Sequence, residues 1–371
     1  MFMDEYHTKK RSEIGKIRAA VLAWYDAERR VLPWRAAPGT ANDPYAVWLS
    51  EIMLQQTTVA TVKGYFEAFM AQWPKVSDLA AAKLDEVLVA WQGLGYYARA
   101  RNLHKCARVV ADEYNGEFPG TVDDLLKLPG IGPYTASAVG AIAFDQSTVP
   151  VDGNIERVVS RLCNIQSPLP GAKSEIQSSA SLFADKNRPG DFAQALMDLG
   201  ATICTPKSPK CMLCPVQKYC DGRKQGDPSI LPVKAPKKVR PERRAVVFWL
   251  ENQEGAVLLR RRPESGLLGG MMEFPSTDWR EGDLPTTEER DAAEPVSVKW
   301  ASLPDEAVHV FTHFKFRMQV FVGKTDRIEN VEGIWVRPEE FSGHALPTVM
   351  KKVIRHVKDH RELSASSLAE N

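Results

Sequence analysis

The residues of this sequence that could do chemistry begin with a carboxylate on an apolar helical stripe. Asp43 and Pro44 are helix-start signals, and Val47, Glu51, Leu54 and Thr58 then fall at helical spacing on one face. Burying an ionised glutamate is unfavourable unless the group is paired or protonated. Desolvation raises a carboxyl pKa, and a general acid that works at neutral pH needs such a raised pKa. Glu51 is therefore a candidate acid, although most single glutamates in such a pattern lie at the edge of a core.

A second carboxylate follows a glycine-rich turn. The segment Leu128-Pro129-Gly130-Ile131-Gly132-Pro133-Tyr134 breaks a short helix predicted over 122–127 and starts another over 133–144. We expect Gly132 to adopt a positive φ, with Pro133 in the first turn of the new helix. Backbone N–H groups at such a helix start can bind phosphate. Asp152 heads a helix predicted over 155–162, where capping would keep its pKa low and its charge present.

Four of the six cysteines form a cluster in a Pro- and Lys-rich segment. They follow the pattern C-x6-C-x2-C-x5-C, at Cys204, Cys211, Cys214 and Cys220. Thiolates at this spacing can close around one tetrahedral zinc ion or one cubane iron–sulfur cluster, and general frequency favours zinc. Cys106 and Cys163 lie outside the pattern, and we expect them to pack as small buried hydrophobes.

The composition is that of an ordinary globular protein. A length of 371 residues suggests roughly two to three domains. The formal net charge is +1, so any nucleic-acid contact must use local basic groups. No apolar run is long enough to span a bilayer, and residues 1–11 lack a signal-peptide core. We expect a cytoplasmic location, with association to the nucleoid if the protein is bacterial, where clustered cysteines indicate metal rather than disulfides.

The periodicity divides the chain into a helical part and a mixed part. Further helices are predicted over 14–28, 45–54, 57–72, 76–82, 84–92, 98–114 and 192–203. A Pro-, Lys- and Arg-rich linker is predicted over 227–244. Strands are predicted over 245–251, 256–261, 296–300, 308–314, 315–322 and 334–336, with a helix over 346–358 and a disordered tail over 359–371.

Two motifs carry a resemblance to a known family. Trp48-Leu49-Ser50-Glu51-Ile52-Met53-Leu54-Gln55-Gln56-Thr57 closely resembles the active-site helix of MutY-type adenine DNA glycosylases. Leu128–Gly132 with the later Val151-Asp152-Gly153-Asn154 resembles the helix–hairpin–helix DNA glycosylase superfamily. The resemblance runs from Leu32 to Lys351. It implies a multi-domain protein with an all-α helix–hairpin–helix glycosylase domain over 1–226, and an α/β Nudix-like domain over 245–358. The loop over 204–220 would then hold a [4Fe–4S] cluster through its four cysteines.

The resemblance also implies roles for single residues. Glu51 would protonate the adenine, and Asp152 would stabilise the positively charged sugar, which Tyr134 and Asn154 position. Residues that contact DNA would be Gln56, Tyr96, Gly130 and Gly132. Residues that line the adenine pocket would be Arg30, Trp34 and Gln194. From the residues alone, Trp34 could equally be a core side chain, and Tyr96 could pack under its turn instead of entering the base stack.

Two departures from related sequences matter for the reaction. Bifunctional relatives carry a lysine nucleophile at the position of Tyr134, and a tyrosine cannot form a Schiff base. In the C-terminal domain, Gly266–Pro275 matches a Nudix loop, but Arg280–Asp291 lacks the glutamate-rich pattern of a Nudix hydrolase. We therefore expect a binding domain. Its Phe311-Thr312-His313 resembles the Phe-Ser-His loop that reads the oxidised guanine, with a threonine that keeps the hydroxyl.

The function implied is a monofunctional glycosylase that removes adenine opposite 8-oxoguanine, and also opposite guanine, from double-stranded DNA. It would act as a monomer, with a [4Fe–4S] cofactor and without a membrane. One competing hypothesis is a thymine or oxidised-pyrimidine glycosylase of the same superfamily; the Nudix-like domain and the missing lysine disfavour it. Another is a catalytically silent lesion-binding protein, which the presence of both Glu51 and Asp152 disfavours.

Overall fold

The computed structural model describes residues 2–236, 239–329 and 331–369, with side chains from Glu13 to Glu362 within these ranges. The chain forms two compact units. The first contains Met1–Ala81 and Asn102–Lys237, and the second contains Ala82–Arg101 and Lys238–Asn371. The first unit is helical and the second is built on a sheet, so the predicted multi-domain fold class is confirmed.

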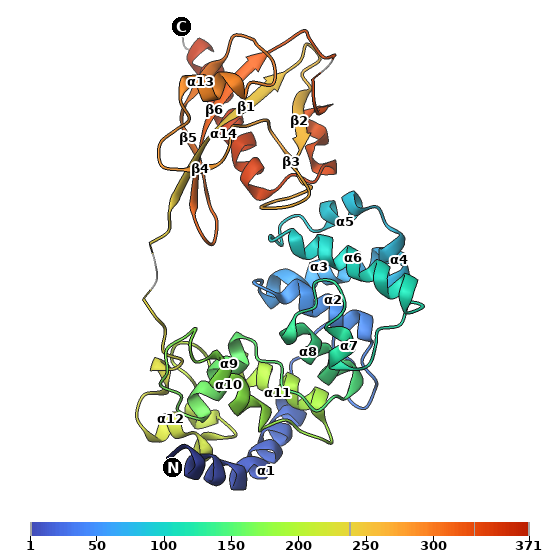
Figure 1. Ribbon diagram of the computed structural model, residues 1–371, viewed down its shortest axis with the longest axis vertical. Helices are drawn as coiled ribbons and strands as arrows, with labels where there is room; N and C mark the ends of the chain where they lie inside the picture. Colours follow the sequence, from blue (N-terminus) through green and yellow to red (C-terminus); the bar gives the residue numbers. More distant parts are fainter. Residues whose placement is uncertain (1, 237–238, 330, 370–371) are drawn as a thin grey trace. The chain divides into compact units, whose positions relative to one another are not determined.

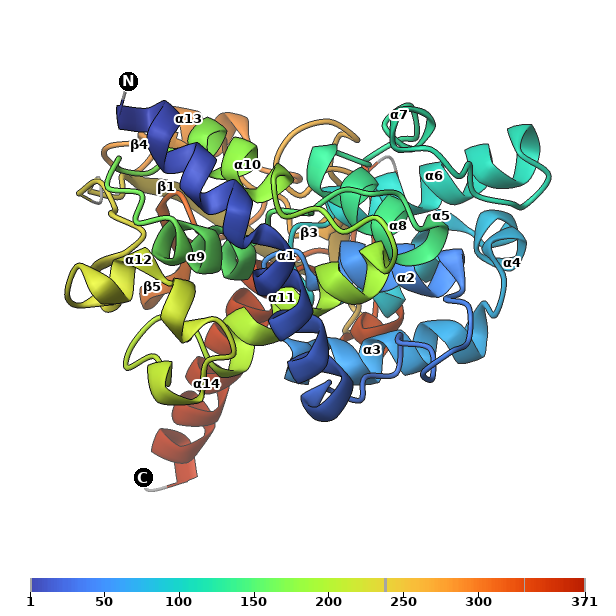
Figure 2. The same cartoon turned by 90° about the horizontal axis from the view of Figure 1, so that it is seen from below.

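The first unit is made of helices (Figures 1 and 2), and two of them begin at capping residues that accept hydrogen bonds from the first helical turn. Asp43 accepts a hydrogen bond from the backbone N–H of Tyr45, and Thr58 accepts one from that of Thr61. The helices up to the cysteine loop are α1 (Phe2–Glu28), α2 (Pro44–Leu54), α3 (Val59–Gln72), α4 (Val76–Ala81), α6 (Ala98–Glu113, which begins in the second unit), the short α7 (Val122–Leu125), α8 (Pro133–Phe144), α9 (Gly153–Leu162), α10 (Lys173–Ser181) and α11 (Pro189–Thr202). Short helical turns follow as η1 (Cys211–Leu213), η2 (Gln217–Tyr219), α12 (Asp221–Lys224) and η3 (Pro228–Ile230).

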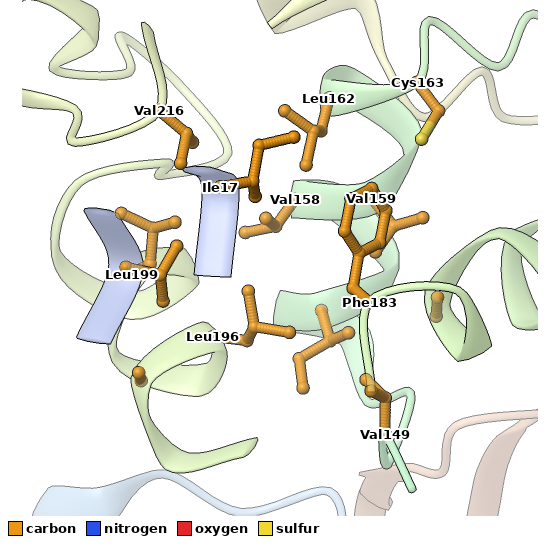
Figure 3. Close-up of a cluster of buried hydrophobic side chains, with 14 of the residues drawn as sticks. Ile17, Val149, Val158, Val159, Leu162, Cys163, Phe183, Leu196, Leu199 and Val216 are labelled. Atoms are coloured by element: carbon orange, nitrogen blue, oxygen red, sulfur yellow. The ribbon is translucent and has the colours of Figure 1, made fainter. Parts of the chain in front are cut away.

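A cluster of buried hydrophobic side chains holds α1, α9 and α11 together (Figure 3). Ile17 of α1 belongs to the same cluster as Val158 and Leu162 of α9, and Leu196 and Leu199 of α11. On α9 the buried apolar residues Ile155, Val158, Val159 and Leu162 recur at helical spacing, because one face of the helix is apolar. This packing fixes the start of α9, and therefore the position of the residue that caps it.

The turn between α7 and α8 differs in one detail from the expectation. Gly130 has the left-handed backbone, with a φ of +75°, whereas Gly132 has a φ of −95° and is the N-cap of α8. A side chain at Gly130 would also place its Cβ 2.6 Å from the Cβ of Asn102. The tight reversal therefore occurs two residues earlier than predicted. Pro133 starts α8 as expected.

The second unit is organised on a mixed sheet with the strand order β3-β2-β1-β6-β5. The central β1 (Glu242–Glu251) runs parallel to β6 (Lys315–Lys324), which pairs antiparallel with β5 (Ala301–Val310). On its other side, β1 pairs with β2 (Val257–Arg261), which in turn pairs with β3 (Met272–Glu273) and β7 (Ile334–Val336), while β4 (Arg280–Glu281) pairs with β1. Valines of α14 (Thr348–Ala369) pack into the core of this sheet.

The segment 82–101 belongs to the sheet unit, and polar contacts join it to other residues of that unit. It contains α5 (Leu84–Ala90). Asp85 pairs with Arg261 at 2.8 Å, and the Gln92 amide donates to the carbonyl of His344 at 2.8 Å. The remaining short elements of the unit are α13 (Thr287–Ala292) and η4 (Pro338–Gly343).

Four expectations about the chain outside the core are corrected. Residues 296–300 form no strand: Trp300 packs against Phe248, with ring centroids 4.9 Å apart, instead of pairing with a neighbour. The α10 helix was not predicted, because its serine-rich sequence shows only weak apolar spacing. The helix α14 continues through 359–369, where we expected a disordered tail. The linker expected over 227–244 is too long at both ends, because Val233 accepts a hydrogen bond from Leu169 and β1 begins at Glu242.

Within the ranges that the structure describes, none of the helices combines the length and apolar character needed to cross a membrane.

Candidate functional site

Glu51 and Tyr134 form a buried polar pair in the first unit. The Tyr134 hydroxyl donates a hydrogen bond to Oε2 of Glu51, with an O···O distance of 2.6 Å. Glu51 lies in the middle of α2, and Tyr134 lies in the first turn of α8, which packs against α2. The Glu51 residue is 4% exposed, as expected for a carboxylate among buried apolar side chains. The predicted stripe is wrong, because Val47–Met53 are buried on all sides of the helix and Thr58 caps α3 instead.

The surroundings of this pair favour a protonated carboxyl. Burial raises the pKa of Glu51 to about 7, against the opposing effect of the Tyr134 hydrogen bond. The negative charge of Asp152 adds to the increase, and the positive charge of Arg35 opposes it. Burial also raises the pKa of the Tyr134 hydroxyl, so this phenol remains a donor at neutral pH. Glu51 can therefore hold and release a proton near neutrality.

Asp152 is the N-cap of α9, as predicted. Its Oδ1 accepts hydrogen bonds from the backbone N–H groups of Asn154 (3.0 Å) and Ile155 (2.7 Å). Its Oδ2 accepts from the Asn154 side-chain amide at 2.8 Å. The expected low pKa is wrong in direction: burial raises the pKa of Asp152, and the hydrogen bonds only partly oppose this. The sequence predicts that Asp152 caps the helix, but it does not show how deeply the carboxyl is buried.

Asn154 is held from two sides. Arg157 donates to its Oδ1 at 2.9 Å, and also donates to the carbonyl oxygen of Cys204 at 2.7 Å. On the other side, a side chain at Gly200 would place its Cβ 2.6 Å from the Cβ of Asn154. A glycine at this point of α11 therefore lets the two helices approach closely.

A buried ion-pair network lies beside this site. Both carboxylate oxygens of Asp198 accept hydrogen bonds from Arg35 at 2.7 Å, and Oδ1 also accepts from Nε of Arg30 at 2.6 Å. Burial alone would raise the pKa of Asp198, but the two arginines outweigh it and lower that pKa. Arg30 was predicted as a pocket residue, whereas Asp198 was missed. Asp198 gives the same signal as Glu51, a carboxylate within an apolar helix.

The other two predicted pocket residues are buried near this part of the fold. Trp34 is 8% exposed and packs edge-on against Phe66, with ring centroids 5.5 Å apart. This packing supports the core interpretation of Trp34. Gln194 lies on α11 and donates to the carbonyl of Gly190 within its own helix, at 3.2 Å. The structure thus brings Arg30 into the polar network and places Trp34 and Gln194 in the packed interior.

Two residues expected to enter DNA share an unusual backbone. Gln56 has a φ of +58° and Tyr96 has a φ of +49°, both in the left-handed region that side chains other than glycine rarely adopt. Both are exposed, and Tyr96 retains 44% of its accessible surface. In contrast, the neighbouring Tyr97 is 4% exposed. The two tyrosines therefore divide the roles: Tyr97 packs under the turn, and Tyr96 is presented by it.

The segment Phe311-Thr312-His313 forms the turn between β5 and β6. The backbone N–H of Phe311 donates to the carbonyl of Phe314 at 2.9 Å, which closes the turn. Phe311 is half-buried, while Thr312 and His313 are exposed. The hydroxyls of Thr312 and Tyr96, both in the second unit, are hydrogen-bonded to each other. The predicted strand over 308–314 thus ends at Val310, and its last residues form the turn.

The four clustered cysteines are half-buried in the loop that follows α11. Burial raises the pKa of the Cys214 thiol to about 12, and the charges of Cys204, Cys220 and Cys211 add to this, so the four thiols lie close enough to interact. Arg161 of α9 is 1% exposed and donates to Sγ of Cys204 at 3.4 Å. Among the residues that the structure describes, Arg161 forms no ion pair with a carboxylate. A buried cation of this kind fits a group carried by anionic thiolates.

Comparison with known proteins follows the same division of the chain. Residues 49–181 match the HhH-GPD superfamily of base excision DNA repair proteins. Residues 204–220 match the iron–sulfur binding domain of endonuclease III, and residues 246–356 match the NUDIX domain. The adenine DNA glycosylase of Homo sapiens is 38% identical over 409 residues, covering 93% of this chain and 74% of the human protein. The chain belongs to the adenine DNA glycosylase family.

Further matches agree with this assignment. The adenine DNA glycosylase of Buchnera aphidicola subsp. Schizaphis graminum is 32% identical, covering 91% of this chain and 97% of that protein. Among solved structures, a thermostable thymine-DNA glycosylase aligns with a TM-score of 0.52 and 30% identity, over 59% of this chain and 99% of its own. The aligned 59% of this chain is therefore about as long as its helical part.

The family assignment decides between the two metal interpretations. The enzyme carries a [4Fe–4S] cluster, as the match to the endonuclease III domain over 204–220 indicates. In the described part of the chain, no three His, Cys, Asp or Glu side chains are gathered closely enough to hold a single metal ion. Cys204, Cys211, Cys214 and Cys220 would hold the cluster through their four thiolates.

Proposed function

We propose that this glycosylase removes adenine opposite 8-oxoguanine, and also opposite guanine, without cleaving the DNA strand. The main support for the proposed reaction is the buried Glu51 carboxyl, which has a pKa of about 7 and accepts a hydrogen bond from Tyr134. Asp152 lies close enough for its negative charge to raise the pKa of Glu51. One group can thus hold a proton while the other holds a negative charge, because like charges in a low-dielectric site are not ionised together.

The proposed reaction begins with the adenine flipped out of the duplex. Glu51 donates its proton to a ring nitrogen, and the glycosidic bond breaks with its electron pair moving to the base. The sugar becomes an oxocarbenium-like cation, which Asp152 stabilises through its charge while Asn154 and Tyr134 position the sugar. A water molecule then attacks the anomeric carbon, and its proton goes to the Glu51 carboxylate. The products are free adenine and an abasic site.

Strand cleavage is not part of the proposal. A lyase step needs an amine that forms a Schiff base with the sugar. The position that holds a lysine in bifunctional relatives is Tyr134 here, and its hydroxyl is committed to Glu51. The expected product is therefore an intact strand that breaks at the abasic site only after alkali treatment.

The strained residues support a role in extruding the base. Flipping a nucleotide requires a few kcal/mol of unstacking free energy. A side chain inserted into the vacated space offsets part of this, and Gln56 and Tyr96 are both exposed on turns with a left-handed backbone. Such backbones are retained mainly where the surroundings require them, as at ligand sites. We propose that both side chains enter the duplex, and that backbone N–H groups at Gly130–Gly132 bind a phosphate.

The C-terminal domain is proposed to read the base opposite the adenine. Thr312 and His313 offer a hydroxyl and an imidazole at an exposed turn, where they can reach the edge of an oxidised guanine. Hydrolysis is disfavoured because Glu289, in the helix that follows the Nudix-like loop, is already engaged. It accepts a hydrogen bond from the backbone N–H of Thr286 at 2.7 Å and pairs with Arg280. We propose a binding domain without a hydrolase reaction.

A thymine-specific enzyme is the second candidate, because the thymine-DNA glycosylase named above shares 30% identity over the helical part. Its alignment covers 59% of this chain. The family relatives that match nearly the whole chain act on adenine by name.

All the catalytic residues proposed lie within one chain, so we propose that the enzyme works as a monomer. The enzyme would act in the cellular compartment that contains chromosomal DNA.

One experiment tests the proposal directly. The full-length protein would be incubated with duplexes that carry adenine opposite 8-oxoguanine, adenine opposite guanine, adenine opposite thymine, or thymine opposite guanine. We expect a break at the adenine of the first two duplexes after alkali, none before it, and no reaction on the other two. Release of thymine, or strand breaks before alkali treatment, would contradict the proposed specificity or the proposed monofunctional chemistry.

A further inference from the structure

Glu273 is a buried carboxylate to which the proposed reaction gives no role. It lies on β3, within the Gly266–Pro275 loop region, and is 2% exposed. Arg260 donates to its Oε1 at 2.8 Å, and Arg262 donates to its Oε2. Burying a charge is costly even when it is paired, so an apolar residue would serve a plain core equally well. The retained charge indicates that the arginines are being oriented.

Arg262 transmits this order to an aromatic ring. Its guanidinium lies over the ring of Trp279, 4.6 Å from the centroid, and its Nε donates to the carbonyl of Leu267 at 3.1 Å. A cation over the face of a tryptophan is a favourable and directional contact. Trp279 itself is stacked on Phe316 of β6, with centroids 4.1 Å apart and an interplanar angle of 29°. The indole is therefore held between a charged group and the sheet.

Trp279 in turn contacts the turn that carries Thr312 and His313. Its ring lies 6.1 Å from that of Phe311, which also stacks on Phe314 at 4.6 Å. Phe311 is the inward-facing side chain of this turn, whereas Thr312 and His313 are exposed. The orientation of the two polar side chains depends on how firmly Phe311 is seated, because the turn itself is closed by one backbone hydrogen bond, from Phe311 to Phe314.

We propose that Glu273, Arg262 and Trp279 are positioning residues for lesion selectivity. They hold the ring of Phe311 in place. The turn that contains Phe311 then keeps the hydroxyl of Thr312 and the imidazole of His313 where an oxidised guanine is read. The inference rests on the proposed reading function of the 311–313 turn. Hydrogen-bond discrimination needs groups held within a few tenths of an ångström, so a loosened support lowers selectivity before it lowers excision.

The test compares two tryptophans of the same unit. Trp279→Leu removes one of the rings that pack against Phe311, and the rings of His309 and Phe314 remain. Trp249→Leu removes a core ring that packs on Phe274 and Phe341 instead. Single-turnover excision rates would be measured for both full-length variants on adenine opposite 8-oxoguanine and adenine opposite guanine. Thermal unfolding would establish that each variant is folded at the assay temperature.

We expect Trp279→Leu to lower the ratio of the two rates by roughly three- to tenfold, the size of a lost hydrogen-bond contact. Trp249→Leu should lower the unfolding temperature and leave the ratio unchanged. Trp279→Phe, which keeps an aromatic ring under Arg262, should restore most of the ratio. If Trp279→Leu does not fold, Arg262→Gln and Glu273→Gln carry the same test. An unchanged ratio in all of these variants, or an equal loss in Trp249→Leu, would overturn the proposal.

The design separates this failure from that of the reading function. If the wild-type enzyme does not prefer 8-oxoguanine, or if Thr312→Val and His313→Leu both leave the ratio unchanged, the turn is not the reader and the positioning role falls with it. If Thr312→Val lowers the ratio and Trp279→Leu does not, the turn reads the lesion without this support, and the positioning role alone is wrong.

Discussion

Glu51 and the Thr312–His313 turn use polar side chains in opposite environments. Glu51 is 4% exposed, within a helix whose neighbouring side chains are buried, and burial raises its pKa to about 7. Thr312 and His313 are exposed on a turn, and the rigid groups lie beneath them. A group that transfers a proton gains from the loss of water, because desolvation tunes its pKa. A group that reads a base must stay accessible, so its order has to come from the side chains that support it.

The largest effect in this comparison is expected at Glu51. Glu51→Gln keeps the shape of the side chain and its acceptor for the Tyr134 hydroxyl, but it cannot donate an acidic proton. We expect the single-turnover excision rate to fall by about 10²–10⁴-fold, the usual contribution of a general acid, with little change in DNA affinity. Excision kinetics and a binding assay on the same duplex measure the two quantities.

The pH profile is the control for this assignment. A general acid must be protonated, and Glu51 loses its proton as the pH rises through about 7. The wild-type rate should therefore be highest below this pH and fall above it, while the residual rate of Glu51→Gln should lack this dependence. A wild-type rate that stays constant from about pH 6 to about pH 9 would show that a group other than Glu51 donates the proton.

The next effect concerns stability. Asp198→Asn leaves the buried guanidinium of Arg35 without its counter-charge, and breaking such a buried pair lowers the free energy of unfolding by about 3–5 kcal/mol. Asp26→Asn is the matched control, because Asp26 pairs with Arg188 at the surface, with 54% of its side chain exposed. A surface pair contributes about 0–1 kcal/mol. Urea unfolding of both variants would show equal losses if the Asp198 network were unimportant.

These residues also show how far sequence reasoning extends. The limits of α8, the capping role of Asp152 and the burial of Glu51 could be predicted, because each depends on neighbours within a few positions. The pair between Arg35 and Asp198 could not, since it joins residues 163 positions apart. The rise in the Asp152 pKa was likewise hidden, because it depends on how deeply the folded chain buries this carboxyl.

The sheet unit adds a further kind of failure. A predicted strand ending at Trp300 is a segment with strand-like composition whose backbone does not pair. Trp300 packs instead over Gly323 of β6, where a Cβ would lie 2.7 Å from the indole ring. Composition describes which residues suit a sheet, but the choice between pairing along an edge and packing across a face is made by tertiary contacts.

The hairpin is a third way to use polar groups, because it offers backbone N–H groups and no side chain. Gly130→Ala combines a φ of +75° with a Cβ 2.6 Å from Asn102, so we expect a loss of about 1–3 kcal/mol in the free energy of unfolding. At Gly132 the φ is −95° and no atom lies within 4 Å of an added Cβ. Gly132→Ala should therefore change stability by about 0.5 kcal/mol or less. Equal losses in thermal unfolding would mean that the reversal is not centred on Gly130.

The smallest effect tests the exposed half of the comparison. Thr312→Val removes the hydroxyl and keeps the branched shape, while Thr312→Ser keeps the hydroxyl and removes a methyl group. Because one hydrogen bond contributes about 1 kcal/mol, the valine variant should lower the preference for 8-oxoguanine over guanine by roughly three- to tenfold. The serine variant should retain the preference.

This pair of variants also separates reading from positioning of Tyr96, whose hydroxyl is bonded to that of Thr312. Tyr96→Phe removes the same hydrogen bond from the other side and leaves the Thr312 hydroxyl free to reach the lesion. If Thr312 reads the base, the ratio of single-turnover rates falls in Thr312→Val and is kept in Tyr96→Phe. If the hydroxyl serves only to hold the tyrosine, both variants lose the ratio equally, and the accessible side chain would then belong to the supporting structure instead of the recognition surface.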